Sequence, residues 1–162
     1  LDERLQLAAQ SGASHSVNAQ QDDPVAAIQD LTGGGARVVF MVTRTPKILP
    51  DCMRAAAAGG TVSMTGSPPG QVEIGLQEEL LRKELTIIGT HQKLYPREPF
   101  HHFQWTRGAN RQYIFDAMAR DEFQVGHLIS HRVPYRDAPE MYAMINRGPK
   151  GWQSIILEWE GS

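Results

Sequence analysis

The stretch that decides the fold covers residues 36–70 and reads ARVVFMVTRTPKILPDCMRAAAAGGTVSMTGSPPG. Its apolar run at residues 38–42 predicts a buried strand. A helical run follows as far as Ala58, and a Gly59-Gly60 turn leads into a second strand at residues 61–65. Two buried strands joined by a helix are typical of a βαβ unit in a parallel sheet. The sequence therefore predicts an α/β protein.

Polar tips follow both of these strands. Residues 43–45 read Thr-Arg-Thr after the first strand, and residues 66–70 form a tight, glycine-containing tip after the second. Because α/β folds bind ligands at the carboxyl ends of parallel strands, we expect the ligand site to lie at these two tips.

Helices and strands alternate on either side of this unit. The expected helices cover residues 2–11, the run opened by Asp23 and Pro24, a short piece around Leu80, residues 110–120 and residues 137–147. The expected strands are 14–17, a weak 72–74, 86–89, 128–133 and 153–159. The triplet at residues 33–35 is all glycine and leads into a strand, which favours a helix C-cap over a phosphate cradle. This order predicts a doubly wound, mainly parallel sheet that lacks its first βαβ, followed by a C-terminal helix and strand segment.

Composition narrows the class of protein. The chain has 162 residues, of which 41% are hydrophobic and 21% charged, as in an ordinary globular domain. A net charge of −2 gives no support for nucleic acid or membrane as a partner. A single cysteine, Cys52, excludes an internal disulfide and is typical of a cytoplasmic protein. Since the chain starts at Leu1 inside a helical segment, we expect it to be part of a longer protein.

Ordered pieces along the whole chain resemble the medium-chain dehydrogenases of the zinc alcohol dehydrogenase type. The matching pieces are Asp2-Glu3-Arg4-Leu5 through Ser11-Gly12-Ala13, Leu31-Thr32-Gly33-Gly34, residues 37–42, Ala58-Gly59-Gly60-Thr61-Val62 through Gly66, residues 81–89, residues 128–134, Asp137-Ala138-Pro139-Glu140 and residues 155–159. The resemblance implies a partial Rossmann fold, with residues 1–90 as the second half of the dinucleotide-binding domain and residues 91–162 as a segment returning toward the catalytic domain.

The resemblance also implies a function. Such enzymes transfer hydride between an alcohol and the nicotinamide of NAD or NADP, with a zinc ion whose ligands fall outside this chain. It implies a small alcohol or carbonyl substrate, a homodimer and a cytoplasmic location. Because the pyrophosphate loop and the metal site are not in this sequence, we expect the chain alone to be inactive, with no catalytic residue of its own.

Carried over position by position, the resemblance implies a set of cofactor contacts. Met41, Val42, Thr43 and Arg44 match a tip near the adenosine end, although a solvated loop arginine is an equal interpretation of Arg44. The remaining matches are Thr65, Gly66 and Ser67 for the nicotinamide carboxamide, Ile87, Ile88 and Gly89 beside the nicotinamide, and Arg4 near the adenosine ribose. A glycine needed only for the turn explains Gly66 equally well, and a helix-surface charge is the favoured interpretation of Arg4.

The histidines do not predict a metal site. His101 and His102 are adjacent, so they point apart on a regular element. His91 and the aromatic residues at 95–105 are candidates for a substrate cleft or a dimer surface, with an ordinary packed loop as the alternative.

Two other functions stay open on the sequence. One is a non-catalytic nucleotide-binding or interaction module derived from a Rossmann fold, and the other is a methyltransferase-like α/β domain. The coding sequence upstream of Leu1 would discriminate among them.

Overall fold

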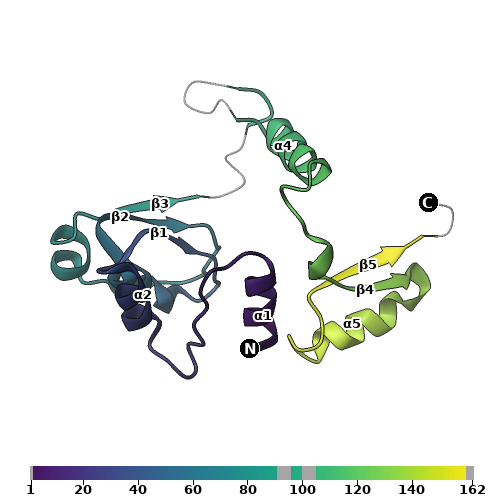
Figure 1. Cartoon of the computed structure of the whole chain (residues 1–162), viewed down its shortest axis with the longest axis horizontal. Coiled ribbons are helices and arrows are strands. Elements are labelled where there is room, and N and C mark those ends of the chain that lie inside the picture. The colour runs from purple at the N-terminus through teal and green to yellow at the C-terminus, as the bar shows by residue number, and fades with distance from the viewer. Residues whose placement is uncertain (1, 91–95, 100–104, 160–162) are drawn as a thin grey trace. The chain divides into compact units, whose positions relative to one another are not determined.

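The computed structural model describes residues 2–90, 96–99 and 105–159 (Figure 1). The chain divides into two compact units. We call Val17–Gly108 the central unit, and Leu1–Ser16 together with Ala109–Ser162 the terminal unit. The predicted domain division between residues 90 and 91 does not coincide with these contact-defined units, and it stays a prediction.

The central unit contains a three-stranded parallel sheet. Its strands are β1 (Ala36–Met41), β2 (Ala56–Met64) and β3 (Thr86–Gly89), in the order β1-β2-β3. Four rows of the register run across all three strands, among them one through Val39, Val62 and Ile87 and another through Met41, Met64 and Gly89. The predicted βαβ unit is confirmed, and the carboxyl ends of the three strands meet at one edge.

The helices of the central unit follow their local sequence signals. In α2 (Pro24–Thr32), the Asp23 side chain accepts hydrogen bonds from the N–H groups of Val25 and Ala26, at 2.8 and 3.3 Å. Gly33 ends this helix in the left-handed region with φ +70°, so the glycine triplet is the predicted C-cap. The next helices are the 3₁₀ turn η1 (Pro46–Ile48), α3 (Leu49–Ala55) and the π-helix η2 (Leu76–Leu81).

The Gly59-Gly60 pair does not form the expected turn. The helix that was expected to reach Ala58 ends at Ala55, and β2 begins at Ala56. The pairing jumps from Ala36 opposite Ala56 to Val38 opposite Thr61, so both glycines lie in a bulge of β2. Gly59 has φ +69°, which explains why glycine is needed there.

Two expected strands are wrong. Residues 14–17 and 72–74 form no ladder in the described structure. The side chains of Val72 and Ile74 instead pack against the core. β-branched residues such as these two are favoured in strands mainly because they pack well on a half-buried surface. Here the same side chains are packed without a strand.

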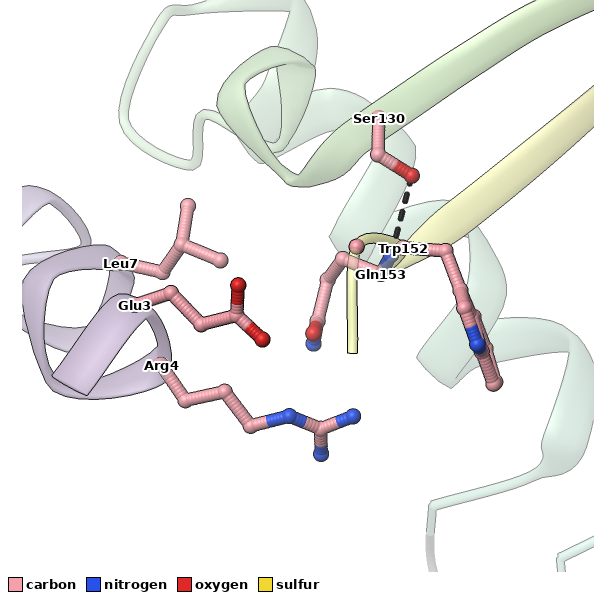
Figure 2. Close-up of a pocket in the computed structure, with 7 residues that line it drawn as sticks. Glu3, Arg4, Leu7, Ser130, Trp152 and Gln153 are labelled. Carbon is pink, nitrogen blue, oxygen red and sulfur yellow. Dashed lines mark hydrogen bonds between the residues drawn. The ribbon is translucent and has the colours of Figure 1, made fainter. Parts of the chain in front are cut away.

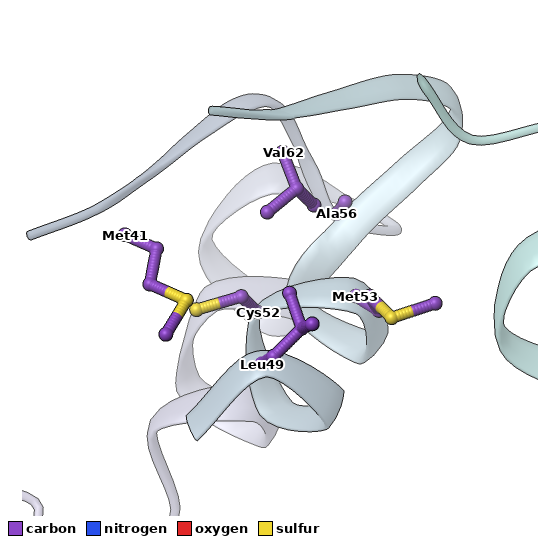
Figure 3. Packing of buried hydrophobic residues seen from close by; sticks show 6 residues of the cluster. All are labelled: Met41, Leu49, Cys52, Met53, Ala56 and Val62. Carbon is purple, nitrogen blue, oxygen red and sulfur yellow. The ribbon is translucent and has the colours of Figure 1, made fainter. Parts of the chain in front are cut away.

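The core lies between α3 and one face of the sheet. Met41, Leu49, Cys52, Met53, Ala56 and Val62 form its buried cluster (Figure 3). The opposite face of β1 is exposed, with Val38 at 50% and Phe40 at 68%. The prediction that this strand is buried therefore holds for one of its faces only, because strand side chains alternate between faces and the described helices cover one.

The terminal unit contains a second, smaller parallel pair. Strands β4 (Ile129–Pro134) and β5 (Ser154–Glu158) are joined through α5 (Ala138–Asn146). Ser130 ties the strands together, since its Oγ donates to the Ser154 carbonyl at 3.0 Å and accepts from the Gln153 N–H at 2.9 Å. The other elements are α1 (Asp2–Gln10), α4 (Arg107–Ala119) and the 3₁₀ turns η4 (Gly126–Leu128) and η5 (Tyr135–Asp137).

The helices of the terminal unit are less buried than their apolar periodicity predicts. The pattern in α4 indicates Tyr113, Ile114, Ala117 and Met118 as an inward face, yet only Ala117 of these four is buried. In α5 the Tyr142 side chain is 63% exposed. Periodicity identifies the apolar face of a helix, but it does not supply the surface that covers it.

Candidate functional site

The carboxyl edge of the central sheet brings together the tips predicted to bind a ligand. The N–H groups of Thr65 and Gly66 both donate to the Met41 carbonyl, at 3.1 and 2.8 Å. The N–H of Thr90 donates to the Met64 carbonyl at 3.1 Å. These bonds continue the ladder past the last strand residues and fix the three tips against one another.

Gly66 is explained by chain packing. A Cβ at this position would lie 2.4 Å from the Thr43 carbonyl oxygen and 2.8 Å from the Thr43 nitrogen. No larger residue fits unless the tip of β1 moves. The requirement for glycine therefore comes from the neighbouring tip, and contact of Gly66 with a ligand stays a prediction.

Gly89 has the opposite environment. A Cβ there would meet no atom of the described residues within 4 Å, and its backbone is outside the left-handed region. Neither conformation nor packing among the described residues requires glycine here. Among the described residues, no atom occupies the space beside the Gly89 backbone at the carboxyl end of β3.

Three hydroxyl groups cluster at the same edge. Ser63 Oγ lies 3.5 Å from Thr65 Oγ1 and 3.3 Å from Thr90 Oγ1, and the two threonine oxygens are 3.4 Å apart. Thr90 Oγ1 also donates to the Met64 carbonyl at 3.1 Å. Sequence reasoning missed Ser63 and Thr90 as site residues. The available signal was the spacing of Ser63 and Thr65, which places both on one face of the strand.

The polarity of this edge limits which ligand groups it suits. The N–H groups of Thr65, Gly66 and Thr90 are all used within the sheet. Hydroxyl oxygens keep lone pairs beyond the one proton each donates. The edge therefore offers a ligand hydroxyl groups, which can accept as well as donate hydrogen bonds.

The other predicted contacts differ in exposure. Met41 is buried in the core, whereas Val42 and Arg44 are exposed after β1, and Thr43 Oγ1 accepts from the Thr45 N–H at 3.1 Å. Ser67 and Ile88 are exposed, and Ile87 packs against the core. A ligand at this edge thus meets the tips of the strands rather than the side chains of Met41 or Ile87.

Arg4 lies in the terminal unit, on α1. Its guanidinium donates to the Pro149 carbonyl at 3.3 Å. With Glu3 and Leu7 it lines a cavity of about 210 Å³ (Figure 2). The remaining lining residues are Ser130, Gly151, Trp152 and Gln153. The other predicted cofactor contacts belong to the central unit. The assignment of Arg4 to the adenosine ribose stays a prediction.

A zinc centre does not fit the described residues. They contain no group of three His, Cys, Asp or Glu side chains placed to hold a metal. His127 Nε2 is 2.6 Å from Ser11 Oγ, and His131 Nδ1 is 2.9 Å from Ser130 Oγ. Burial, followed by the charge of Asp51, raises the pKa of the Cys52 thiol, which opposes the thiolate that zinc prefers. The predictions for His91, His101 and His102 fall outside the described residues.

The parallel sheet, with its strands in the order β1-β2-β3, is of the Rossmann-like α/β class. The chain belongs to the zinc-binding dehydrogenase family, whose family model matches residues 1–103. The suspected resemblance is thereby confirmed. In the described part of the chain, no helix is both long and apolar enough to cross a membrane.

A curated relative extends the match beyond residue 103. The L-threonine 3-dehydrogenase of Bacillus licheniformis is 26% identical over 155 residues, covering 94% of this chain and 41% of the relative. Relatives that match nearly the whole of this chain are much longer than it is. The chain spans about two fifths of their length.

Solved structures share the fold. Benzyl alcohol dehydrogenase from Acinetobacter calcoaceticus has a TM-score of 0.77 and 23% identity, covering 98% of this chain and 41% of that one. An alcohol dehydrogenase from E. coli CFT073, complexed with NADH, has a TM-score of 0.75 and 20% identity over 97% and 42%. A protein described as a zinc-binding dehydrogenase from Sinorhizobium meliloti 1021, bound to NADP, has a TM-score of 0.71 and 24% identity over 94% and 42%.

Proposed function

We propose that this chain is the nicotinamide-binding part of an NAD(P)-dependent, zinc-type alcohol or polyol dehydrogenase. Membership of the zinc-binding dehydrogenase family supports this proposal. So does the similarity to a threonine dehydrogenase and a benzyl alcohol dehydrogenase, each of which this chain covers to 41%. The reaction of the whole enzyme is hydride transfer between an alcohol carbon and the nicotinamide ring.

The observation that carries the proposal is the polarity and space at the carboxyl edge of the central sheet. The N–H groups of Thr65, Gly66 and Thr90 are used internally, and hydroxyl oxygens face the same edge. The carboxamide of nicotinamide presents an NH₂ group that donates hydrogen bonds. Gly89 leaves room for the ring beside β3.

The residues of this chain hold and orient the cofactor rather than react with it. In this proposal, the tips after β1 and β2 fix the nicotinamide face, and Arg44 supplies an exposed cation toward the adenosine half or its phosphates. When bound, the nicotinamide ring supplies the hydride acceptor. We propose that the zinc ligands of the parent enzyme lie outside the described residues, which contain no group of three side chains placed to hold a metal.

The finer features of the parent enzyme belong to the same proposal. One solved neighbour holds NADH and another NADP, so both cofactors are candidates. We also propose a small alcohol or carbonyl substrate, a cytoplasmic location and a homodimer. The dimer is suggested by β3, which is an edge strand of the described sheet and so offers unpaired backbone groups. Sedimentation of the full-length enzyme as a monomer would contradict it.

A specific observation favours a second candidate for the chain taken alone. The hydroxyl groups and the space beside Gly89 at the carboxyl edge favour an isolated chain that binds a dinucleotide without catalysis. We expect NADH to bind without turnover. Alcohol-dependent reduction of NAD by the isolated chain would overturn this expectation.

The proposal is tested by titrating the isolated ¹⁵N-labelled chain with NADH. Amide shifts should concentrate at residues 41–44, 64–67 and 87–90. Gly89→Val should weaken binding by about tenfold or more, because its side chain occupies the space for the ring. Gly126→Val is the matched control, since its Cβ also meets open space but lies in the terminal unit. Shifts centred elsewhere, or equal binding by both variants, would contradict the proposal.

A further inference from the structure

The cavity between α1 and the segment that leads into β5 belongs wholly to the terminal unit (Figure 2). Its volume is about 210 Å³, and its lining comes from parts of the chain that are distant in sequence. Residues of α1 form one side, and Ser130 with residues 151–153 forms the other. The edge that is proposed to hold the nicotinamide lies in the central unit, so that proposal does not account for this cavity.

Two opposite charges face the cavity. Glu3 and Arg4 are neighbours in α1, and Figure 2 shows the polar ends of both side chains directed toward the same space. One guanidinium N–H of Arg4 donates to the Pro149 carbonyl at 3.3 Å, which leaves most of its donors for a ligand. Among the described residues, the Glu3 carboxylate has no hydrogen-bond or ion-pair partner, because neighbours in a helix do not face each other. Both charged groups therefore keep the capacity to bind.

This pair of charges determines which ligands the cavity suits. A ligand with one negative charge would be attracted by Arg4 and repelled by Glu3, and the reverse holds for a ligand with one positive charge. A zwitterion can place an ammonium group beside Glu3 and a carboxylate beside Arg4, so that both contacts are attractive. The charge pattern thus favours a zwitterion over an ion of either sign.

The other side chains of the lining offer mainly apolar contacts. The Trp152 indole N–H already donates to the Gly148 carbonyl at 2.8 Å, so its ring is left as an apolar surface. The Ser130 hydroxyl is bonded to the start of β5, and Leu7 adds a second apolar side chain. A volume of about 210 Å³ lies below the roughly 300–1,000 Å³ of sites for drug-sized ligands, so the ligand is small.

We propose that this cavity binds a small free amino acid with an apolar side chain. Glu3 binds the ammonium group, Arg4 binds the carboxylate, and Leu7 and Trp152 contact the side chain. The inference is independent of the proposed function. It gives Arg4 a ligand other than the adenosine ribose that the resemblance implies.

The experiment uses the whole ¹⁵N-labelled chain and three ligands of similar shape. L-Valine carries both charges, isobutylamine lacks the carboxylate, and isovalerate lacks the ammonium group. Valine should shift the amides of residues 3–7 and 151–153 with a dissociation constant of about 1 mM, as expected for so small a ligand. Each singly charged analogue should bind at least about fivefold more weakly, because one attractive contact is lost and one repulsive contact remains.

Two variants separate the charges. Glu3→Gln should weaken valine binding by about fivefold and favour isovalerate, because the repulsive carboxylate is gone. Arg4→Gln should weaken valine binding by a similar factor and favour isobutylamine instead. Glu140→Gln and Arg147→Gln are the matched controls, since both are exposed charges of the terminal unit outside the cavity lining, and they should leave binding unchanged.

The outcomes are distinguishable from those for the proposed function, because NADH is titrated separately and its failure to bind leaves this inference standing. Absence of shifts around the cavity with valine would overturn the inference. Equal binding of valine and both analogues would overturn it too, and this comparison among ligands needs no variant. If adenosine shifts these amides and valine does not, the cavity returns to the ribose contact that the resemblance implies. Urea unfolding checks that each variant folds.

Discussion

The central and terminal units differ in how they bury apolar side chains. In the central unit, Met41, Met53 and Val62 are fully buried beneath the sheet. Among the described residues of the terminal unit, only Ala117 is buried, and it keeps 7% of its surface exposed. An apolar groove of about 120 Å³ lies open between α5 and β5, lined by Ala138, Met141, Tyr142, Ile145, Ile155 and Leu157. We infer that the central unit supplies most of the folding free energy of this chain.

The difference follows from the architecture of each unit. In α3, four of the seven residues are buried against a three-stranded sheet. The terminal unit has two paired strands, and a two-stranded sheet with one helix buries little apolar surface. The following predictions test this contrast, from the largest expected effect to the smallest.

The largest effect is expected for Met53→Ala. Met53 is 0% exposed, so its truncation leaves a cavity and should reduce the free energy of unfolding by about 2–5 kcal/mol. Met141→Ala is the matched control, because Met141 lines the open groove and its loss should cost less than about 1 kcal/mol. Urea denaturation measures both, and equal losses would show that the terminal unit has a core of comparable weight.

Gly66→Ala should have the next largest effect. The added Cβ meets the Thr43 backbone and should lower the free energy of unfolding by about 1–3 kcal/mol. Hydrogen exchange of the Thr65 and Gly66 amides, which donate to the Met41 carbonyl, should accelerate as the two tips separate. Gly89→Ala has open space and is the control. Unchanged exchange in Gly66→Ala would mean that the tips are not packed as described.

Lys83→Met tests a polar contribution to the central unit. The Lys83 ammonium donates to the carbonyls of Met53 and Arg54, both at 2.9 Å, in the last turn of α3. Methionine keeps the length of the side chain and removes the donors, so we expect a loss of about 1 kcal/mol. Lys150→Met, at an exposed position of the terminal unit, should change stability by less than about 0.5 kcal/mol. Thermal unfolding measures both variants, and equal melting temperatures for the two would contradict this prediction.

The smallest effect is the pH dependence contributed by Cys52. Burial, followed by the charge of Asp51, raises the pKa of this thiol above its ordinary value of 9.0. The unfolded chain therefore loses this proton at lower pH than the folded chain, and stability falls as pH rises above that value. We expect a difference below about 1 kcal/mol between about pH 8 and 10. Cys52→Ala should lack this pH dependence. Identical pH profiles of stability for this variant and the unmutated chain would show that burial does not raise the pKa of the thiol.

Local signals were enough to predict several elements. Asp23 and Pro24 begin α2 and Gly33 ends it, because capping depends on residues adjacent in sequence. The strands around residues 38–42 and 86–89 were predicted from their apolar runs, and the ordered motifs predicted the family. The predicted contacts at Met41–Arg44, Thr65–Ser67 and Ile87–Gly89 lie at or near one edge, because parallel strands align their carboxyl ends.

The sequence by itself determined that this chain is α/β and which family it belongs to. It also located the five strands of the described residues, together with two that do not form. Only the tertiary structure decided that Gly66 faces the Thr43 backbone, that Gly89 faces open space, and that Ser63, Thr65 and Thr90 meet. It also decided that Val72 and Ile74 pack without forming a strand. The physical reason is that propensity and capping act between sequence neighbours, whereas close approach, burial and hydroxyl contacts depend on residues distant in sequence.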